Sequence, residues 1–263
     1  MNGNTLELRG LTKRFGGVTA IDSLNLTVEP GQVTALIGPN GAGKTTAINL
    51  ISGFLTPNQG DILFDGDRIN DVAMHRRATV GIARTYQTPQ VTPGLSVLEN
   101  VMLGAHKDGK FRLLDGLMRP HLLMQEQMRL RQLAEAALDL VGVERKFYLR
   151  QGADMAYGIQ RAIELARLIV QRAGFLLLDE PAAGLNHSET DQVAGFVRAR
   201  ADEGCAVLLV EHDMDMVMQV SDRIAVLNFG RLIAEGTPDE IRANPSVIEA
   251  YLGVDDEDED TAA

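Results

Sequence analysis

The chain has 263 residues, 45% of them hydrophobic and 23% charged, a composition typical of a globular protein with a substantial core. It contains no apolar run of about eighteen residues and no basic segment followed by an apolar stretch near its start, so we expect neither a membrane-spanning helix nor a signal peptide. The formal net charge of −11 argues against an overall basic field, and we therefore expect no nucleic-acid partner.

Strand and helix patterns alternate along most of the chain. Apolar and polar residues alternate between 5 and 37, and short apolar runs predict strands at 33–37, 62–64, 175–178, 206–210 and 223–227. Helical spacing or helix-start signals predict helices at 45–51, from 96, at 125–141, 161–171 and 188–200, and from 237. Two of these starts have capping-box pairs, Ser96 with Glu99 and Thr237 with Glu240. The pattern predicts an α/β fold.

One stretch interrupts this pattern, because helical signals dominate between about Ser96 and Ile169. We infer an α/β core that is split by an inserted helical subdomain. We expect a single domain over 1–254, with the core at 1–95 and 170–254, the helical subdomain at 96–169 and a disordered acidic tail at 255–263. The single cysteine, Cys205, lies in an apolar run and is expected to be a buried thiol in a strand, which fits a cytoplasmic protein.

The segment Gly38–Thr45 matches the complete P-loop pattern and lies between a predicted strand and a predicted helix. Its glycines let successive backbone N–H groups point inward around phosphate oxygens. Lys44 supplies a positive charge for the β- and γ-phosphates, and the Thr45 hydroxyl is a ligand for Mg²⁺. The sequence therefore predicts nucleotide binding, although a P-loop alone does not distinguish kinases, GTPases, helicases and transport motors.

Two carboxylates follow the apolar strand Phe175–Leu178. Asp179 lies where a Walker B aspartate would hold magnesium through water, and Glu180 is placed to polarise the attacking water. An acidic pair that merely starts a helix is the alternative, but an aspartate at the exit of a fully apolar strand is a poor structural choice.

Given these motifs, the chain resembles the ABC ATPase family from about Leu6 to Gly253. Further family motifs follow in order: Phe15 as the aromatic that stacks on adenine, Gln87 as the glutamine that contacts magnesium and the membrane partner, Met155–Arg161 as the signature, Asn186 in the D-loop and His212 as the switch histidine. The resemblance implies the P-loop NTPase fold of the ABC-ATPase type, a RecA-like α/β core with an antiparallel β subdomain and an inserted helical subdomain. It also implies ATP and Mg²⁺ as cofactors.

The resemblance implies a complete set of site residues. Those expected to bind nucleotide are Phe15, Gly38, Pro39, Asn40, Gly41, Ala42, Gly43, Lys44, Thr45, Thr46, Ala156, Tyr157, Gly158 and Asn186. Those expected to act in catalysis are Lys44, Gln87, Glu180 and His212, and those expected to hold Mg²⁺ are Thr45, Gln87 and Asp179.

Three residues depart from the family pattern. Ala156 and Ile159 replace the usual serine and glutamine of the signature, and Asn186 replaces the usual aspartate of the D-loop. The signature acts on ATP held by the other protomer, and a missing serine hydroxyl forfeits one bond to a charged oxygen, worth about 1.5–3 kcal/mol. The Gly158 amide and the positive end of the following helix remain.

Within the family, the chain resembles the longer of the two ATPase subunits of branched-chain (hydrophobic) amino-acid importers. The similar stretches are Leu178–Asn186, Glu211–Met214 and Ala250–Gly253, and Ala105–Gln127 resembles the insertion of the longer subunit. This resemblance implies a shorter ATPase as head-to-tail partner, two transmembrane permease subunits and, indirectly, a solute-binding protein. It also implies a peripheral location at the cytoplasmic face of the membrane.

Other functions stay open at this point. ATPases of urea or amide importers and of lipopolysaccharide export are similar to this chain. A non-transport ABC ATPase acting on DNA or the ribosome would carry a long coiled-coil insertion or tandem ATPase domains, and neither is visible. A small-molecule kinase would leave the signature, the D-loop and His212 without explanation.

Overall fold

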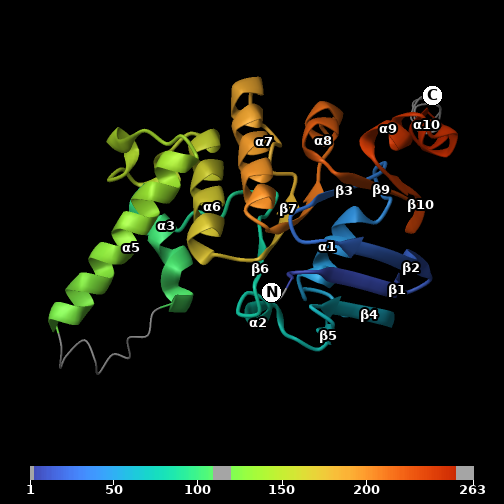
Figure 1. The fold of residues 1–263 in the computed structure, drawn as a ribbon, viewed down its shortest axis with the longest axis horizontal. Coiled ribbons are helices and arrows are strands. Elements are labelled where there is room, and N and C mark those ends of the chain that lie inside the picture. Colours follow the sequence, from blue (N-terminus) through green and yellow to red (C-terminus); the bar gives the residue numbers. More distant parts are fainter. Residues whose placement is uncertain (1–2, 109–119, 253–263) are drawn as a thin grey trace. The chain divides into compact units, whose positions relative to one another are not determined.

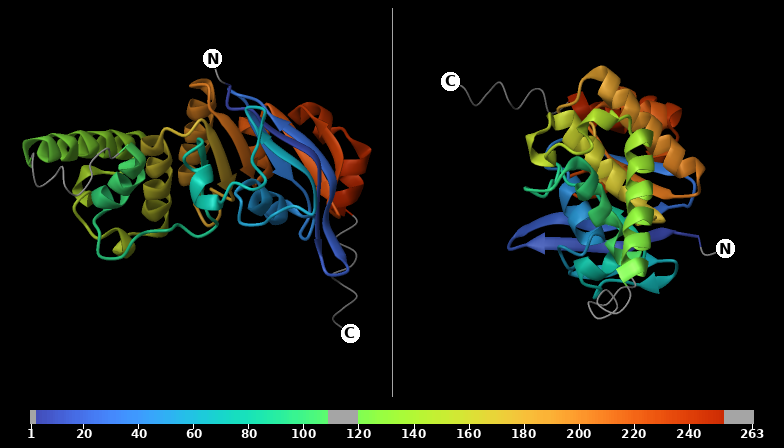
Figure 2. Two further views of the ribbon diagram at one scale, coloured as in Figure 1. Left: turned by 90° about the horizontal axis from the view of Figure 1, so that it is seen from below. Right: turned by 90° about the vertical axis from the view of Figure 1, so that its left-hand side faces the viewer.

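The computed structural model describes residues 3–108 and 120–252. The chain divides into two compact units, which Figures 1 and 2 show as ribbons and which are described separately below. The first unit comprises residues 1–84, 174–183 and 194–263, and the second comprises 85–173 and 184–193. Of the predicted segments, most of the Ala105–Gln127 insertion and the whole 255–263 tail lie outside the residues whose side chains the structure describes.

The first unit contains a four-stranded antiparallel sheet with the order β2-β1-β4-β5. Its strands are β1 (Leu6–Phe15), β2 (Val18–Val28), β4 (Gln59–Phe64) and β5 (Asp67–Arg68). Asp65 and Gly66 both have positive φ, 53° and 83°, which is the backbone of a two-residue hairpin turn. The strands predicted between residues 5 and 37 are confirmed, with alternating burial at the start of β1 and the end of β2 but not in β3 (Val33–Ile37), where every residue is buried.

A six-stranded sheet forms the centre of the first unit, with the order β10-β9-β3-β8-β7-β6. Its strands are β3 (Val33–Ile37), β6 (Ile82–Arg84), β7 (Phe175–Asp179), β8 (Ala206–Val210), β9 (Arg223–Asn228) and β10 (Arg231–Gly236). All neighbours are parallel except β10, which is antiparallel to β9. Every residue of β3, β7 and β8 is buried, as expected for parallel strands covered on both faces.

Helices and apolar clusters cover this sheet. The helices of the first unit are α1 (Lys44–Ile51), α2 (Met74–Arg77), α8 (Met214–Val220), α9 (Pro238–Arg242) and α10 (Pro245–Leu252), and α7 (His187–Asp202) contributes residues to both units. One cluster joins α1 to the antiparallel sheet and includes Ile48 and Leu24, and the other joins Ile37 and Ile224 to Val217 of α8. Each such fully buried side chain stabilises the fold by about 1.5–3 kcal/mol.

The described part of the second unit is helical, apart from one isolated bridge between Ser96 and Gln151. It contains α3 (Val97–Met102), η1 (Leu103–Asp108), α5 (Pro120–Leu140), η2 (Arg145–Phe147), η3 (Gly152–Asp154) and α6 (Tyr157–Gln171). The predicted capping boxes are confirmed, at Ser96–Glu99 before α3 and at Thr237–Glu240 before α9. Helix α6 begins four residues earlier than predicted, because Gly158 weakens the helical signal at its start.

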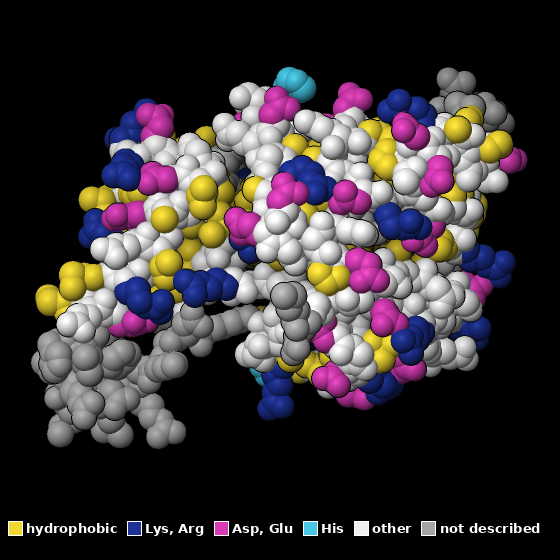
Figure 3. Space-filling view, viewed as in Figure 1, with side chains coloured by type: hydrophobic (Ala, Val, Ile, Leu, Met, Phe, Trp, Pro, Cys, Tyr) yellow, Lys and Arg dark blue, Asp and Glu magenta, His cyan; other side chains and the backbone are white. Residues whose placement is uncertain are grey.

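Charges of both signs are interspersed on the surface that Figure 3 shows, and several exposed groups are paired, such as Arg131 with Glu135 on α5. Cys205 is buried as predicted, although it precedes β8 rather than lying within it, and burial raises the pKa of its thiol. Over residues 3–108 and 120–252, none of the helices combines the length and the hydropathy that a bilayer span requires.

Candidate nucleotide-binding site

The parallel strands of the first unit bring several predicted site residues to one edge of the sheet. The P-loop follows β3, Asp179 ends β7, and His212 lies two residues beyond the end of β8. Because β7, β8 and β3 are neighbours and parallel, their carboxyl ends share an edge. Ligands of open α/β sheets bind at this edge.

The P-loop backbone packs closely against two hairpins. A Cβ atom at Gly38 would lie 2.1 Å from the Leu227 oxygen, and one at Gly43 would lie 2.5 Å from the Ala20 oxygen. Gly41 has φ of 78° with open space around it. Gly38 and Gly43 are therefore required by close packing, and Gly41 by its left-handed backbone.

Lys44 and the start of α1 supply positive potential inside this loop. Lys44 is buried, and its Nζ donates to the carbonyl oxygens of Gly38 at 2.5 Å and Pro39 at 3.0 Å. Burial lowers the pKa of its ammonium group, and the charge of Glu180 opposes that shift. The first turn of α1 contains no acidic side chain, and Gly43 provides no side-chain cap. The helix start therefore suits an anion such as phosphate.

Phe15 lies at the end of β1, where the hairpin turns into β2, and 47% of its surface is exposed. The Lys13 ammonium lies 5.3 Å from its ring centroid. The β9–β10 turn also contacts the P-loop, because the Gly230 amide donates to the Ala42 oxygen at 2.9 Å. Sequence reasoning missed this turn, which is remote from the P-loop along the chain.

Asp179 is 2% exposed, and Arg84 at the end of β6 donates from Nη2 to its Oδ2 at 3.0 Å. The Arg84 Nη1 also donates to Asn49 Oδ1 at 2.8 Å and Ser52 Oγ at 2.9 Å, both in or next to α1. Arg84 thus compensates the buried carboxylate and links β6, β7 and α1. Sequence reasoning missed this role, because β6 has only three residues and gives no clear apolar run before Arg84.

We expect Arg84→Met to lower the free energy of unfolding by about 3–5 kcal/mol, because it leaves the buried Asp179 carboxylate without its ion-pair partner. Arg68→Met is the matched control: Arg68 pairs with Asp61 and Asp71 at an exposed site, where solvent screening leaves such pairs little effect on stability. Urea denaturation of both variants measures the difference, and equal losses would contradict the structural role of Arg84.

Glu180 and His212 lie in direct contact, with 3.0 Å between Glu180 Oε1 and His212 Nε2. Glu180 has a left-handed backbone, with φ of 46°, and its amide donates to the Val210 oxygen at 2.8 Å. Non-glycine residues in this region cost free energy and cluster at active sites. The strained turn directs Glu180 toward His212.

Glu211 was not predicted as a site residue, but it organises the backbone beside this pair. It is 4% exposed and accepts from the Ala182 amide at 2.6 Å and the His212 amide at 3.0 Å. Burial raises its pKa, against the effect of these amide donors. Glu211 therefore joins the turn after Glu180 to the His212 segment.

In the second unit, Ala156, Tyr157 and Gly158 form the start of α6. Ala156 is the N-cap residue and provides no side-chain cap, so the first amides of α6 have no acceptor from that side chain. The expectation that the signature precedes its helix is corrected, since Tyr157 and Gly158 belong to the first turn. A Cβ atom at Gly158 would lie 2.1 Å from Glu189 Oε1 of α7.

Asn186 and Gln87 also lie in the second unit. Asn186 Oδ1 accepts from the Glu189 amide at 3.1 Å, and the Asn186 amide donates to Glu189 Oε2 at 3.0 Å. Because asparagine and aspartate cap helices equally well, the Asn186 departure preserves this local structure. The carbonyl oxygen of Gln87 accepts from Arg161 Nη2 at 2.7 Å and from the Tyr157 hydroxyl at 3.2 Å.

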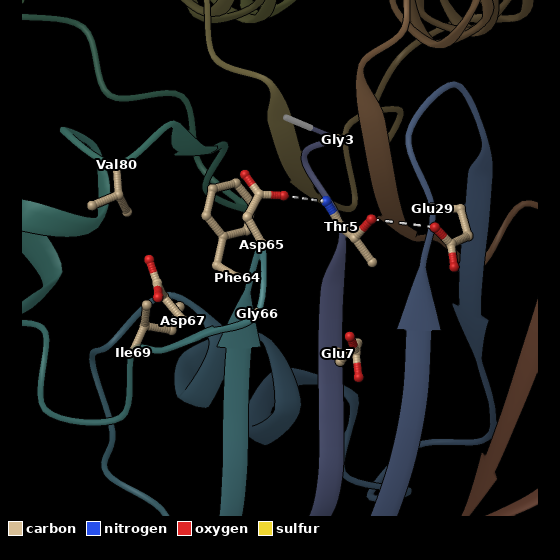
Figure 4. Close-up of a pocket in the computed structure, with 10 residues that line it drawn as sticks. All are labelled: Gly3, Thr5, Glu7, Glu29, Phe64, Asp65, Gly66, Asp67, Ile69 and Val80. Atoms are coloured by element: carbon tan, nitrogen blue, oxygen red, sulfur yellow. Dashed lines mark hydrogen bonds between the residues drawn. The ribbon is translucent and has the colours of Figure 1, made fainter. Parts of the chain in front are cut away.

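An open pocket of about 690 Å³ lies elsewhere in the first unit, at the end of the antiparallel sheet (Figure 4). The carboxylates of Glu7, Glu29, Asp65 and Asp67 line it around Phe64. Three of them are already engaged, since Asp65 accepts from the Thr5 amide, Glu29 from the Thr5 hydroxyl and Glu7 from the Arg9 guanidinium. The pocket contains none of the predicted nucleotide-binding residues.

A glycine-rich loop between a buried parallel strand and a helix, together with the carboxylates after a neighbouring strand, defines the fold as that of a P-loop nucleoside triphosphatase. The profile described as ABC transporter matches residues 21–183, and the profile described as Branched-chain amino acid ATP-binding cassette transporter matches residues 231–257. The chain belongs to the ABC transporter family, as one of its ATP-binding and ATP-hydrolysing subunits.

Named relatives agree with this assignment. The chain is 42% identical to the high-affinity branched-chain amino acid transport ATP-binding protein BraF of Pseudomonas aeruginosa, over 94% of this chain and 97% of the relative. It is 40% identical to LivG of Escherichia coli K12, of the same description, with the same two coverages. The crystal structure of the ADP conformation of MJ1267, an ATP-binding cassette of an ABC transporter, superposes with a TM-score of 0.80 at 29% identity, over 95% of this chain and 99% of that chain. The predicted fold class is confirmed.

Proposed function

We propose that this subunit hydrolyses ATP to power the import of branched-chain or other hydrophobic amino acids. The observation that carries the ATPase chemistry is the meeting of the P-loop, Asp179, Glu180 and His212 at one edge of the parallel sheet. The substrate class is supported by the profile match at 231–257 and by the descriptions of BraF and LivG. The solute itself never contacts the ATPase subunit in this proposal.

The residues present fit Mg²⁺ as well as ATP. Among the described residues, no group of three or more His, Cys, Asp or Glu side chains could hold a metal by itself. Mg²⁺ in phosphoryl-transfer sites is held through one or two protein oxygens together with substrate phosphates, and the Thr45 hydroxyl and the Asp179 carboxylate supply such oxygens. Mg²⁺ would neutralise charge on the phosphates, while Glu180 would orient the attacking water.

The proposed assembly is a head-to-tail pair with a second, shorter ATPase subunit, on the cytoplasmic face of two membrane permeases. In such a pair, the start of α6 faces ATP bound to the partner's P-loop. Ala156 contributes no hydroxyl there, so amide groups and the helix dipole must hold the γ-phosphate. We therefore propose that the chain alone dimerises weakly and hydrolyses ATP slowly.

Reconstitution of the chain with its co-purified permeases, partner ATPase and solute-binding protein in proteoliposomes tests this function. We expect ATP-dependent uptake of labelled leucine, isoleucine or valine, and an ATPase rate at least about fivefold above that of the isolated chain, within the range of known allosteric couplings. Uptake of urea or short amides, without uptake of leucine, would replace the proposed substrate class. If no permease co-purifies with the chain and no membrane partner raises its ATPase rate, the transport function is overturned.

A further inference from the structure

The backbone of residues 86 and 87 is held by side chains of α6, all within the second unit. Arg161 Nη1 donates to the Tyr86 oxygen and Arg161 Nη2 to the Gln87 oxygen, both at 2.7 Å. Glu164 Oε1 accepts from the Tyr86 amide at 3.0 Å. The segment that carries Gln87 is therefore bonded to α6 through both a backbone donor and two backbone acceptors.

Arg161 and Glu164 form a buried pair that gives this attachment a fixed geometry. Arg161 is 1% exposed and Glu164 is 5% exposed, and Arg161 Nη1 lies 2.6 Å from Glu164 Oε2. The planar guanidinium donates in fixed directions, so its contacts specify where the two carbonyl oxygens lie. A lysine at this position would keep the charge but not the forked geometry.

Tyr157 adds a third attachment from the first turn of the same helix. Its hydroxyl donates to the Gln87 oxygen at 3.2 Å and accepts from Arg161 Nη2 at 3.1 Å. Its ring also lies against the D-loop, because a Cβ atom at Gly184 would be 3.5 Å from Tyr157 Cε1. Gly184 has φ of 75°, so this approach suits glycine.

We propose that Tyr157 and Arg161 are positioning residues that fix Gln87, the start of α6 and Gly184 as one body. This inference rests on the proposed function, in which the start of α6 faces the partner's ATP, and on the expectation that Gln87 contacts the membrane partner. The three motifs are separate in sequence, and the Tyr157 hydroxyl and the Arg161 guanidinium join them. We call these two side chains, with the backbone of residues 86 and 87 that they hold, the clamp. When Gln87 is displaced, the signature segment then moves together with it.

The test uses Tyr157→Phe and Arg161→Lys in the reconstituted transporter. Tyr157→Phe removes one hydroxyl and leaves the ring against Gly184, so kcat should fall about 2–10-fold, as for one lost hydrogen bond. In Arg161→Lys, kcat should fall further than in Tyr157→Phe. The KM for ATP should stay unchanged in both variants. Arg131→Lys on the exposed face of α5, where Arg131 pairs with Glu135, is the matched control and should keep full activity.

A double-mutant cycle with Gln87→Ala separates positioning from general stability. If the clamp acts through Gln87, adding Tyr157→Phe to Gln87→Ala should cause no further loss of kcat. A purely structural role would give additive losses and a lowered Tm, and that result would overturn the proposal. Unchanged kcat in both single variants would overturn it as well.

Hydrogen exchange supplies a readout that does not depend on turnover. Amide exchange in residues 85–90 should accelerate about tenfold or more in Arg161→Lys, while exchange in α1 stays as in the wild type. If the amides of residues 85–90 are equally protected from exchange in wild type and variant, Arg161 does not hold this segment and the proposal is overturned. Absence of ATPase activity in the wild-type complex would instead refute the proposed function, and the exchange result would still decide whether the clamp exists.

Discussion

Glu180→Gln is expected to bind ATP as the wild type does and to hydrolyse it about 10²–10⁴-fold more slowly, the range for loss of a general base. Glutamine preserves the size of the side chain and can still contact His212 Nε2, which lies 3.0 Å from Glu180 Oε1 in the wild type. It removes the negative charge that orients and polarises the attacking water. The left-handed backbone at residue 180 is retained, so the change isolates the charge.

Single-turnover hydrolysis with nucleotide affinity measured in parallel checks this result. Glu203→Gln is the control, since Glu203 is an exposed carboxylate paired with Arg200. This variant should hydrolyse ATP at the wild-type rate. A turnover within threefold of the wild type in Glu180→Gln would mean that another group acts as the base. His212 would then be the first residue to test, because it is the side chain in contact with Glu180.

The interior strands of the parallel sheet could be predicted from the sequence because each is a continuous apolar run. β3, β7 and β8 are buried on both faces, so all of their residues obey the same hydrophobic requirement. The P-loop was recognised for a related reason, since close packing fixes Gly38 and Gly43 and a left-handed backbone fixes Gly41. Motifs written in contiguous residues carry their own context.

Elements at the edges of the sheet were harder to predict. β6 has three residues and ends in Arg84, and β10 is mostly half-buried, so neither contains a clean apolar run. Their place in the sheet comes from pairing with β7 and β9, which is a tertiary effect. The same limit hid the Arg84–Asp179 ion pair.

Contacts that join distant motifs were outside the reach of a single sequence. Glu211 was seen only as part of a motif around His212, but its carboxylate also holds the Ala182 amide. Tyr157 was treated as a signature residue, but its hydroxyl also contacts the Gln87 carbonyl. A hydrogen bond between a side chain and the backbone constrains the residue type of only one partner, because any residue can supply the backbone group. Such bonds therefore leave no spacing pattern in the sequence.

Lys44→Ala is expected to abolish ATP hydrolysis and to weaken ATP binding about 10–150-fold, as for a lost hydrogen bond to a charged group. The Lys44 ammonium lies inside the P-loop, on the oxygens of Gly38 and Pro39, and phosphate would offer it a stronger acceptor. Alanine removes that charge at the start of α1, and the dipole of α1 alone does not replace it.

The same variant should keep the stability of the fold, and the pKa of Lys44 gives the reason. Burial lowers that pKa below the ordinary 10.5, so the charged form is disfavoured in the folded chain. This cost is present at pH values below the lowered pKa and disappears as the pH rises through it toward 10.5. Alanine removes the cost together with two hydrogen bonds, so the free energy of unfolding at neutral pH should change by about 1 kcal/mol or less.

Isothermal titration with ATP, a malachite-green phosphate assay and urea denaturation measure the three quantities on one preparation. Lys146→Ala is the matched control, since Lys146 is an exposed lysine paired with Glu144 and should leave all three unchanged. Loss of hydrolysis together with a large loss of stability would make Lys44 a structural residue of the loop. Wild-type hydrolysis in Lys44→Ala would remove the P-loop from the reaction, because Lys44 is the buried cation at the start of α1.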